Sequence, residues 1–163
     1  MFALRYAAVV AASLWGGGLL VLGAIAAPSI FDTLAARGVY EGRVLAGAIF
    51  GEALRRFHLL SYACGTLIGV SLVVRAALGP RPAPFGLRLA VLAVMLAAAV
   101  YSGTALTARI ERARQAAGGA PSALAPDDPR RIAFGRLHGI STVLQVVPLV
   151  GSLALIFWEL KDR

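Results

Sequence analysis

The sequence predicts an all-α integral membrane protein, a four-helix bundle whose spans run up-down-up-down. The 163 residues are 59% hydrophobic, and the mean hydropathy of +0.78 is higher than that of a typical soluble domain. The apolar residues lie in four blocks, each close to the roughly 20 residues with which a helix crosses the hydrocarbon. The charged residues lie mainly between these blocks. Residues 1–163 are therefore expected to form a single transmembrane domain.

The first span is expected over residues 6–30. Its basic start and apolar run resemble a signal peptide, but the run is much longer than the apolar core of about 7–15 residues that a signal peptide carries. Small residues recur near one helical face, at Ala12, Gly16, Gly23 and Ala27. Such a stripe favours close helix packing in lipid, so we expect a retained span.

The first connection, residues 31–56, is too polar to cross a membrane because charged residues are distributed through it. Apolar residues nevertheless recur at helical spacing, at Val44, Leu45, Ala48 and Ile49. This pattern predicts an amphipathic helix at the membrane interface. It is expected to feed straight into the second span, over residues 57–74.

The second connection, residues 75–86, contains Pro80, Pro82 and Pro84. Prolines so closely spaced cannot continue a helix, so a tight turn is expected here. The third span follows over residues 87–108 and ends before the charged run that starts at Arg109. The third connection, residues 109–131, includes a stretch rich in Ala, Gly, Ser and Pro that is typical of a flexible loop.

The fourth span has the best-marked start. Asp128 is a favourable N-cap, and Pro129 suits the first helical position. The membrane span is expected over residues 132–158, with Trp158 as an anchor at the interface. A helix from Pro129 to Trp158 is about 45 Å long at 1.5 Å per residue, so its first turns must stand outside the hydrocarbon.

The formal charge of +8 arises from 16 basic residues against 8 acidic ones. The arginines lie mainly in the connections, where anionic lipid headgroups account for them. No basic stretch is interleaved with aromatic residues as in a nucleic-acid site, so we expect no nucleic-acid partner. The sole cysteine, Cys64, excludes an internal disulfide and a cysteine zinc site. Counting basic residues places the two long connections in the cytoplasm, and we expect a multi-pass protein of the bacterial inner (plasma) membrane.

Two segments, residues 56–61 and 136–141, share the pattern Arg, apolar, His, any residue, apolar, Ser. They open the second and fourth spans, which begin on the same face in an up-down bundle. The pattern predicts two helical hairpins related as a parallel repeat. It also brings His58 and His138, the two histidines of the chain, to one membrane face. The opposite face, with its proline-rich turn, is expected to be a simple closure.

The histidines are the candidate ligand-binding residues, because polar groups within spans usually face the bundle interior. Helices about 9–10 Å apart would place His58 and His138 roughly 13 Å apart on the diagonal of the bundle. That spacing suits two axial ligands of a haem b iron, with Arg56 and Arg136 as partners of the propionates. Alternatively, the same histidines hold a transition-metal ion, with Glu111 as a further ligand.

The residues leave other functions open. In a structural alternative, both histidines hydrogen-bond near the interface and only fix the helix ends. The chain would then be a structural or accessory membrane subunit without a ligand, and a further alternative is an oligomeric metal transporter. A homo-oligomer or a larger membrane complex is expected in either case. No nucleophile–base–acid set is present, so we do not expect an enzyme.

Several of these segments also carry a resemblance to a known family. They are residues 15–18 (Trp-Gly-Gly-Gly), 49–51 (Ile-Phe-Gly), 56–58 (Arg-Phe-His), 104–109 (Thr-Ala-Leu-Thr-Ala-Arg) and 134–141 (Phe-Gly-Arg-Leu-His-Gly-Ile-Ser). On these the chain resembles the transmembrane protein 205-like family, four-span proteins catalogued as a domain of unknown function. It departs from that family at Gln145, where an asparagine is usual, and at Gly51, where proline is frequent. The resemblance implies a four-span membrane fold and no particular reaction.

Overall fold

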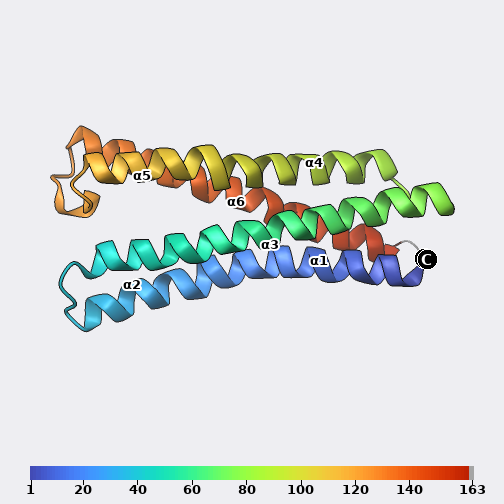
Figure 1. Cartoon of the computed structure of the whole chain (residues 1–163), viewed down its shortest axis with the longest axis horizontal. Coiled ribbons are helices and arrows are strands. Elements are labelled where there is room, and N and C mark those ends of the chain that lie inside the picture. Colours follow the sequence, from blue (N-terminus) through green and yellow to red (C-terminus); the bar gives the residue numbers. More distant parts are fainter. Residues whose placement is uncertain (162–163) are drawn as a thin grey trace.

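The structure is a computed structural model that describes residues 1–161 and consists of four long helices joined by short connections (Figure 1). In chain order the elements are α1 (Phe2–Leu20), η1 (Val21–Ala26), α2 (Ala27–Ala36), α3 (Gly42–Leu78), α4 (Phe85–Tyr101), η2 (Ser102–Leu106), α5 (Thr107–Ala116), η3 (Pro121–Ala123) and α6 (Pro129–Lys161). The elements α1, η1 and α2 form one continuous helix, as do α4, η2 and α5. No strand occurs within the described residues. The all-α, four-helix prediction is confirmed.

The helix ends fall on two faces of the molecule, which we name by their content. The terminal face holds Met1, the turn between α3 and α4, and the end of α6 (Figure 1). The loop face holds the two other connections, residues 37–41 and 117–128. The chain crosses between these faces four times in alternating directions, as the up-down-up-down prediction requires.

All four helices are long and apolar enough to cross a membrane, with 35, 37, 32 and 33 residues. Each exceeds its predicted span: at 1.5 Å per residue α3 is about 55 Å long, against a hydrocarbon core of about 30 Å. The uncharged stretch of α3 between Arg56 and Arg75 covers about 27 Å, so the hydrocarbon fits between the levels of these two arginines. The loop-face ends of the helices therefore stand outside it. The chain is a multi-pass integral membrane protein.

The first long helix contains a π-helical segment, η1, which ends two residues before Pro28. Proline lacks a backbone N–H, and its ring crowds the carbonyl one turn earlier. The wider turn of a π-helix accommodates that lost hydrogen bond without ending the helix. The helix consequently runs on to Ala36, six residues beyond the predicted span of 6–30.

The amphipathic helix predicted in the first connection begins at Gly42 and continues without a break into the second span as α3. It packs against α2, because the first helix is longer than predicted and supplies an apolar partner. Gly42 permits this approach, since a Cβ there would lie 3.2 Å from the Leu34 carbonyl oxygen. Residues 42–56 therefore extend the bundle and do not form a separate surface helix.

The predicted proline-rich turn and the predicted start of the fourth helix are confirmed. Helix α3 ends at Leu78 and α4 begins at Phe85. Helix α6 begins at Pro129, and Oδ1 of Asp128 accepts a hydrogen bond of 2.8 Å from the backbone N–H of Arg130. Asp128 is therefore the N-cap that the sequence predicts.

The hydrophobic core lies in the half of the bundle nearer the terminal face. Trp15, Leu72 and Met95 are almost fully buried there, where α1, α3, α4 and α6 meet. Towards the loop face, α2 packs chiefly against α3, and α5 chiefly against α6, so the two hairpins separate (Figure 1). The four helices thus share one core in one half of the bundle, whereas in the other half the packing is chiefly within each hairpin.

The backbone agrees with the predicted two-hairpin repeat. Gly38 and Gly118 both adopt left-handed conformations, with φ of 60° and 69°, just after the ends of α2 and α5. They are separated by the same number of residues as His58 and His138. The π-helical segments η1 and η2 also fall at nearly corresponding positions. Each hairpin therefore combines a helix that contains a π-helical segment, a connection with a left-handed glycine, and a second long helix.

Candidate functional site

His58 lies inside the bundle on α3, at the level where the two hairpins begin to separate. Its side chain is buried, and Nδ1 lies 2.8 Å from the Leu54 carbonyl oxygen. A carbonyl can only accept, so Nδ1 carries the proton and donates it. Nε2 is then left with its lone pair, the arrangement in which a histidine can ligate a metal or accept a hydrogen bond.

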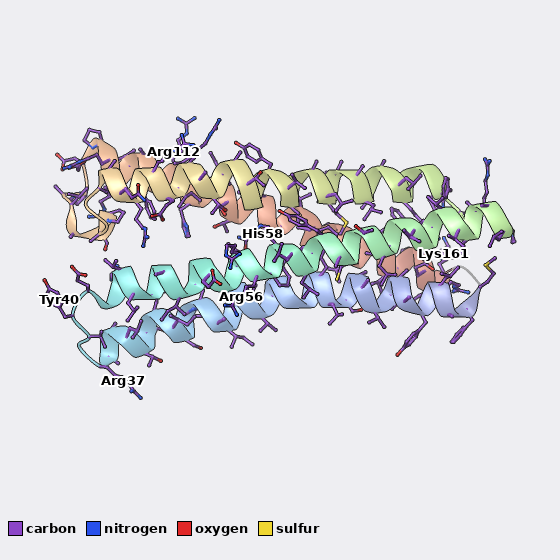
Figure 2. The ribbon with its side chains drawn as sticks, in the orientation of Figure 1. Arg37, Tyr40, Arg56, His58, Arg112 and Lys161 are labelled. Atoms are coloured by element: carbon purple, nitrogen blue, oxygen red, sulfur yellow. The ribbon has the colours of Figure 1, made fainter. Side chains whose placement is uncertain are left out.

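The position of His58 depends on a glycine of the second hairpin. A Cβ at Gly103, within η2, would lie 2.8 Å from Cδ2 of His58 and would also clash with the Tyr62 hydroxyl. Tyr62 lies beside His58 with ring centroids 6.3 Å apart. Figure 2 shows His58 pointing from α3 into the space between the hairpins. The absence of a side chain at Gly103 therefore creates the room that the imidazole occupies.

A small cavity adjoins His58 and is lined by residues of all four long helices. Its volume is about 10 Å³, which is room for about one water molecule. Trp15 of α1, Ser61 of α3, Ser102 of η2 and Gln145 of α6 contribute to its lining together with His58. The cavity thus joins polar groups of both hairpins at their junction. We call it the His58 cavity.

His138 does not line this cavity. Its side chain is exposed and stacks on Phe134, with ring centroids 6.1 Å apart and an interplanar angle of 7°. It precedes Gln145 by two helical turns on nearly the same side of α6, about 10 Å along the axis. His138 therefore lies on the loop-face approach to the cavity and is not a preformed partner of His58.

The other predicted site residues are held in local contacts or are exposed. Nε of Arg56 lies 2.7 Å from Oε1 of Glu52 on the surface of α3. Glu111 pairs with Arg114 one turn away, at 3.0 Å. Arg136 is exposed on α6. None of the three lines the His58 cavity.

Haem does not fit this site. A pocket for a ligand of drug size occupies about 300–1,000 Å³, whereas the cavity beside His58 holds about 10 Å³. Over residues 1–161 no group of three or more His, Cys, Asp and Glu side chains could hold a metal ion. A metal ion at His58 would therefore need the oxygen atoms of Ser61, Ser102 and Gln145 as its further ligands.

A second polar feature, which we did not predict, lies at the terminal face. Arg75 and Arg88 point at one carboxylate, that of Glu159, and all three side chains are buried. Nη1 of Arg88 lies 2.8 Å from Oε1 of Glu159, and Nη2 of Arg88 donates to the backbone oxygens of Ala83 and Trp158. We call this group the arginine cluster. The simple closure expected at this face is therefore wrong.

The sequence did carry a signal for the arginine cluster. Each of its three members stands at one end of a long stretch of helix that contains no other charged residue. Ionisable residues at such positions are costly to bury and usually pair with one another. The predicted connection 75–86 includes Arg75, whereas the structure places Arg75 within α3 and Arg88 within α4.

A family model described as a domain of unknown function, DUF4149, matches residues 10–118 of the chain. The match extends from α1 through α5 and includes His58, Arg75 and Arg88, but not α6. No curated protein and no solved structure matches the chain. The description of the family assigns no reaction, ligand or partner.

Proposed function

We propose, from the premise that this chain belongs to the family described as a domain of unknown function, DUF4149, that it binds a small cation at the His58 cavity. The cation class is a transition-metal ion that accepts imidazole as a ligand. Because the family description names no activity, the proposal rests on the geometry of the site. It keeps the metal hypothesis drawn from the sequence and gives up haem.

The single observation that carries the proposal is the hydrogen bond of His58. Its Nδ1–H is held by the Leu54 carbonyl at 2.8 Å, which orients the ring and leaves Nε2 as a lone-pair donor. Metal-binding histidines usually have their second nitrogen fixed by a carbonyl or a carboxylate in this way. His58 also lines a cavity together with other polar residues, which a histidine in a purely packing role does not require.

The remaining ligands in this proposal are neutral oxygens. Ser61 donates its own hydroxyl proton to the Phe57 carbonyl at 3.0 Å, so its oxygen lone pairs remain for a cation. Gln145 and Ser102 supply amide and hydroxyl oxygens from the second hairpin. A site with one imidazole and no carboxylate binds weakly, because nothing in it neutralises the charge of the ion. Reversible binding, not permanent retention, is therefore expected.

The ion would reach the cavity from the loop face, where the hairpins separate. His138 lies on that side of α6 and offers an exposed imidazole two turns before Gln145. The arginines at this face raise the potential that a cation meets. Glu52 and Asp128 offset part of that potential through their ion pairs with Arg56 and Arg130.

Two alternatives from the sequence stay separate proposals. A structural or accessory subunit is favoured by the small size of the cavity, which a single water would fill. An oligomeric metal transporter would need a homodimer or a larger assembly, because four spans alone offer little room for a pore. We also propose that the protein lies in the bacterial inner membrane and that it is similar to the transmembrane protein 205-like family.

Metal titration of the purified full chain tests the proposal. Isothermal titration with Zn²⁺ and Ni²⁺, followed by elemental analysis, should give one ion per chain for the wild-type protein. His58→Ala should abolish that binding, and His138→Ala should weaken it only slightly. Equal binding by wild type and His58→Ala would overturn the proposal and leave the structural alternative.

A further inference from the structure

A cavity of about 340 Å³ lies at the terminal face, on the opposite side of the bundle from His58. It is lined by Met1, Arg5, Arg75 and residues 79–83, which include Arg81, so three of its lining residues are arginines. No acidic residue of the described chain lines it. We call it the arginine cavity. Its volume is that of a small-molecule site, and its wall is basic.

The three arginines differ in how firmly they are held. Arg75 is buried against Glu159. Arg5 contacts the same residue, with Nη2 donating a hydrogen bond to its backbone oxygen and Nε 3.7 Å from Oε2. Arg5 is also one-third exposed. Arg81 is exposed in the turn, and no hydrogen bond or ion pair to its side chain occurs among residues 1–161. The cavity thus has one fixed basic wall and two guanidinium groups within reach of solvent.

The level of the cavity in the membrane follows from the aromatic residues around it. Phe2 and Tyr6 are 81% and 65% exposed, and their rings stack at a centroid distance of 6.5 Å one turn or less from Arg5. Trp158 of α6 lies beside the arginine cluster, since its carbonyl accepts a hydrogen bond of 3.1 Å from Arg88. Tyrosine and tryptophan are enriched at the level of the lipid headgroups. The hydrocarbon limit at Arg75 gives the same level independently.

The geometry points to a phosphate group as the ligand of the arginine cavity. Guanidinium groups offer planar pairs of donors that match phosphate oxygens, and they keep their charge under all conditions. At headgroup depth the phosphate can belong to a membrane lipid or arrive as free phosphate, and both sources present the same oxygens. Arg81 and Arg5 bind the phosphate, and Arg75 forms the fixed wall behind it. This inference is independent of metal binding at His58.

The site is tested with the full chain in detergent and a matched pair of lipids. Phosphatidic acid and diacylglycerol of the same acyl chains differ only in the phosphate. Native mass spectrometry of the wild-type protein should show bound phosphatidic acid and at least about tenfold weaker binding of diacylglycerol, since charged hydrogen bonds are lost. Similar retention of both lipids would overturn the assignment.

Substitutions then locate the binding. Arg81→Gln and Arg5→Gln should each weaken the binding of phosphatidic acid about tenfold, and Arg81→Lys should fall between wild type and Arg81→Gln. Arg112→Gln, an exposed change on α5 near the loop face (Figure 2), is the matched control and should leave binding unchanged. An equal loss in Arg112→Gln would show that the attraction is non-specific and would overturn the site.

Competition with inorganic phosphate distinguishes the two sources. Displacement of phosphatidic acid by millimolar phosphate, absent in Arg81→Gln, supports the site and assigns it to soluble phosphate. Retention of phosphatidic acid under the same conditions, with the Arg81→Gln loss intact, supports the site and assigns it to a lipid headgroup. Arg81 is exposed, so its variant is expected to fold and the result does not depend on the arginine cluster.

Discussion

Arg75 and Glu159 are 84 positions apart in the chain, yet Nη1 of Arg75 lies 2.7 Å from each oxygen of the Glu159 carboxylate. The pair joins α3 of the first hairpin to α6 of the second, and Arg88 joins α4 to the same carboxylate. The only other long-range ion pair among the described residues is that of Arg5 with Glu159. One carboxylate therefore connects all four helices at the terminal face.

Glu159→Gln should destabilise the protein strongly. The substitution keeps the volume but leaves buried arginines without this carboxylate, and breaking a buried pair from one side costs about 3 kcal/mol or more. The thermal unfolding midpoint, followed by circular dichroism in detergent, should fall by several degrees. Glu111→Gln removes a local, part-exposed pair and should change the stability by less than about 1 kcal/mol. Equal midpoints for the two variants would contradict the role assigned to Glu159.

Adjacent glycines in α1 should respond oppositely to alanine. A Cβ at Gly16 would lie 2.9 Å from the Ser152 Cβ, whereas a Cβ at Gly17 meets nothing within 4 Å. Gly16→Ala should cost about 1–3 kcal/mol, because α1 and α6 must move apart. Gly17→Ala should be neutral or stabilising, since alanine is the better helix former. Denaturation in mixed micelles measures both, and a destabilised Gly17→Ala would refute the packing described here.

Ser152→Ala should be tolerated. Oγ of Ser152 is buried, and no hydrogen-bond partner for it occurs among the described residues. Removing an unpaired buried hydroxyl relieves a desolvation cost of about 1 kcal/mol or more. The unfolding midpoint should stay the same or rise. Ser61→Ala is the comparison, because its hydroxyl donates to the Phe57 carbonyl, and a larger loss in Ser152→Ala than in Ser61→Ala would count against this reading.

Asp128→Ala should weaken the start of α6 in a pH-dependent way. The hydrogen bond with the Arg130 side chain lowers the Asp128 pKa from 3.8 to about 2. A carboxyl with a lowered pKa stabilises the folded state above its unfolded pKa, and that contribution is lost as the pH falls through about 2. The unfolding midpoint of Asp128→Ala should therefore lie below wild type at pH 7 and converge with it near pH 2. Asp127→Ala, at the exposed neighbour, is the control and should leave the unfolding midpoint at pH 7 close to that of the wild type.

The architecture could be predicted because its signals are local. The hydropathy blocks predicted the four helices. Pro80, Pro82 and Pro84 predicted the turn, and Asp128 with Pro129 predicted the start of α6. The helix lengths could not be read in the same way. Residues 31–36 and 42–56 look too polar to span, yet they form helix because α2 and α3 pack against each other outside the hydrocarbon.

The two histidines show why a shared motif did not predict a shared environment. His58 is buried because Gly103 of the second hairpin lies against its ring. The residue corresponding to Gly103 in the first hairpin is Gly23, and a Cβ there would meet nothing within 4 Å. The hairpins thus pack asymmetrically, so His138 is exposed although the local sequence is alike. The arginine cluster could not be predicted for a related reason. It forms only because α3, α4 and α6 bring Arg75, Arg88 and Glu159 to the same level of the bundle.

The most direct test of the account is whether Nε2 of His58 coordinates a metal ion. The purified chain should be loaded with one equivalent of Cu²⁺ and measured by pulsed electron paramagnetic resonance, which detects a ligating imidazole through its remote nitrogen. The account predicts one imidazole signal in wild type and in His138→Ala, and none in His58→Ala. A signal that persists in His58→Ala, or that is lost only in His138→Ala, would contradict it.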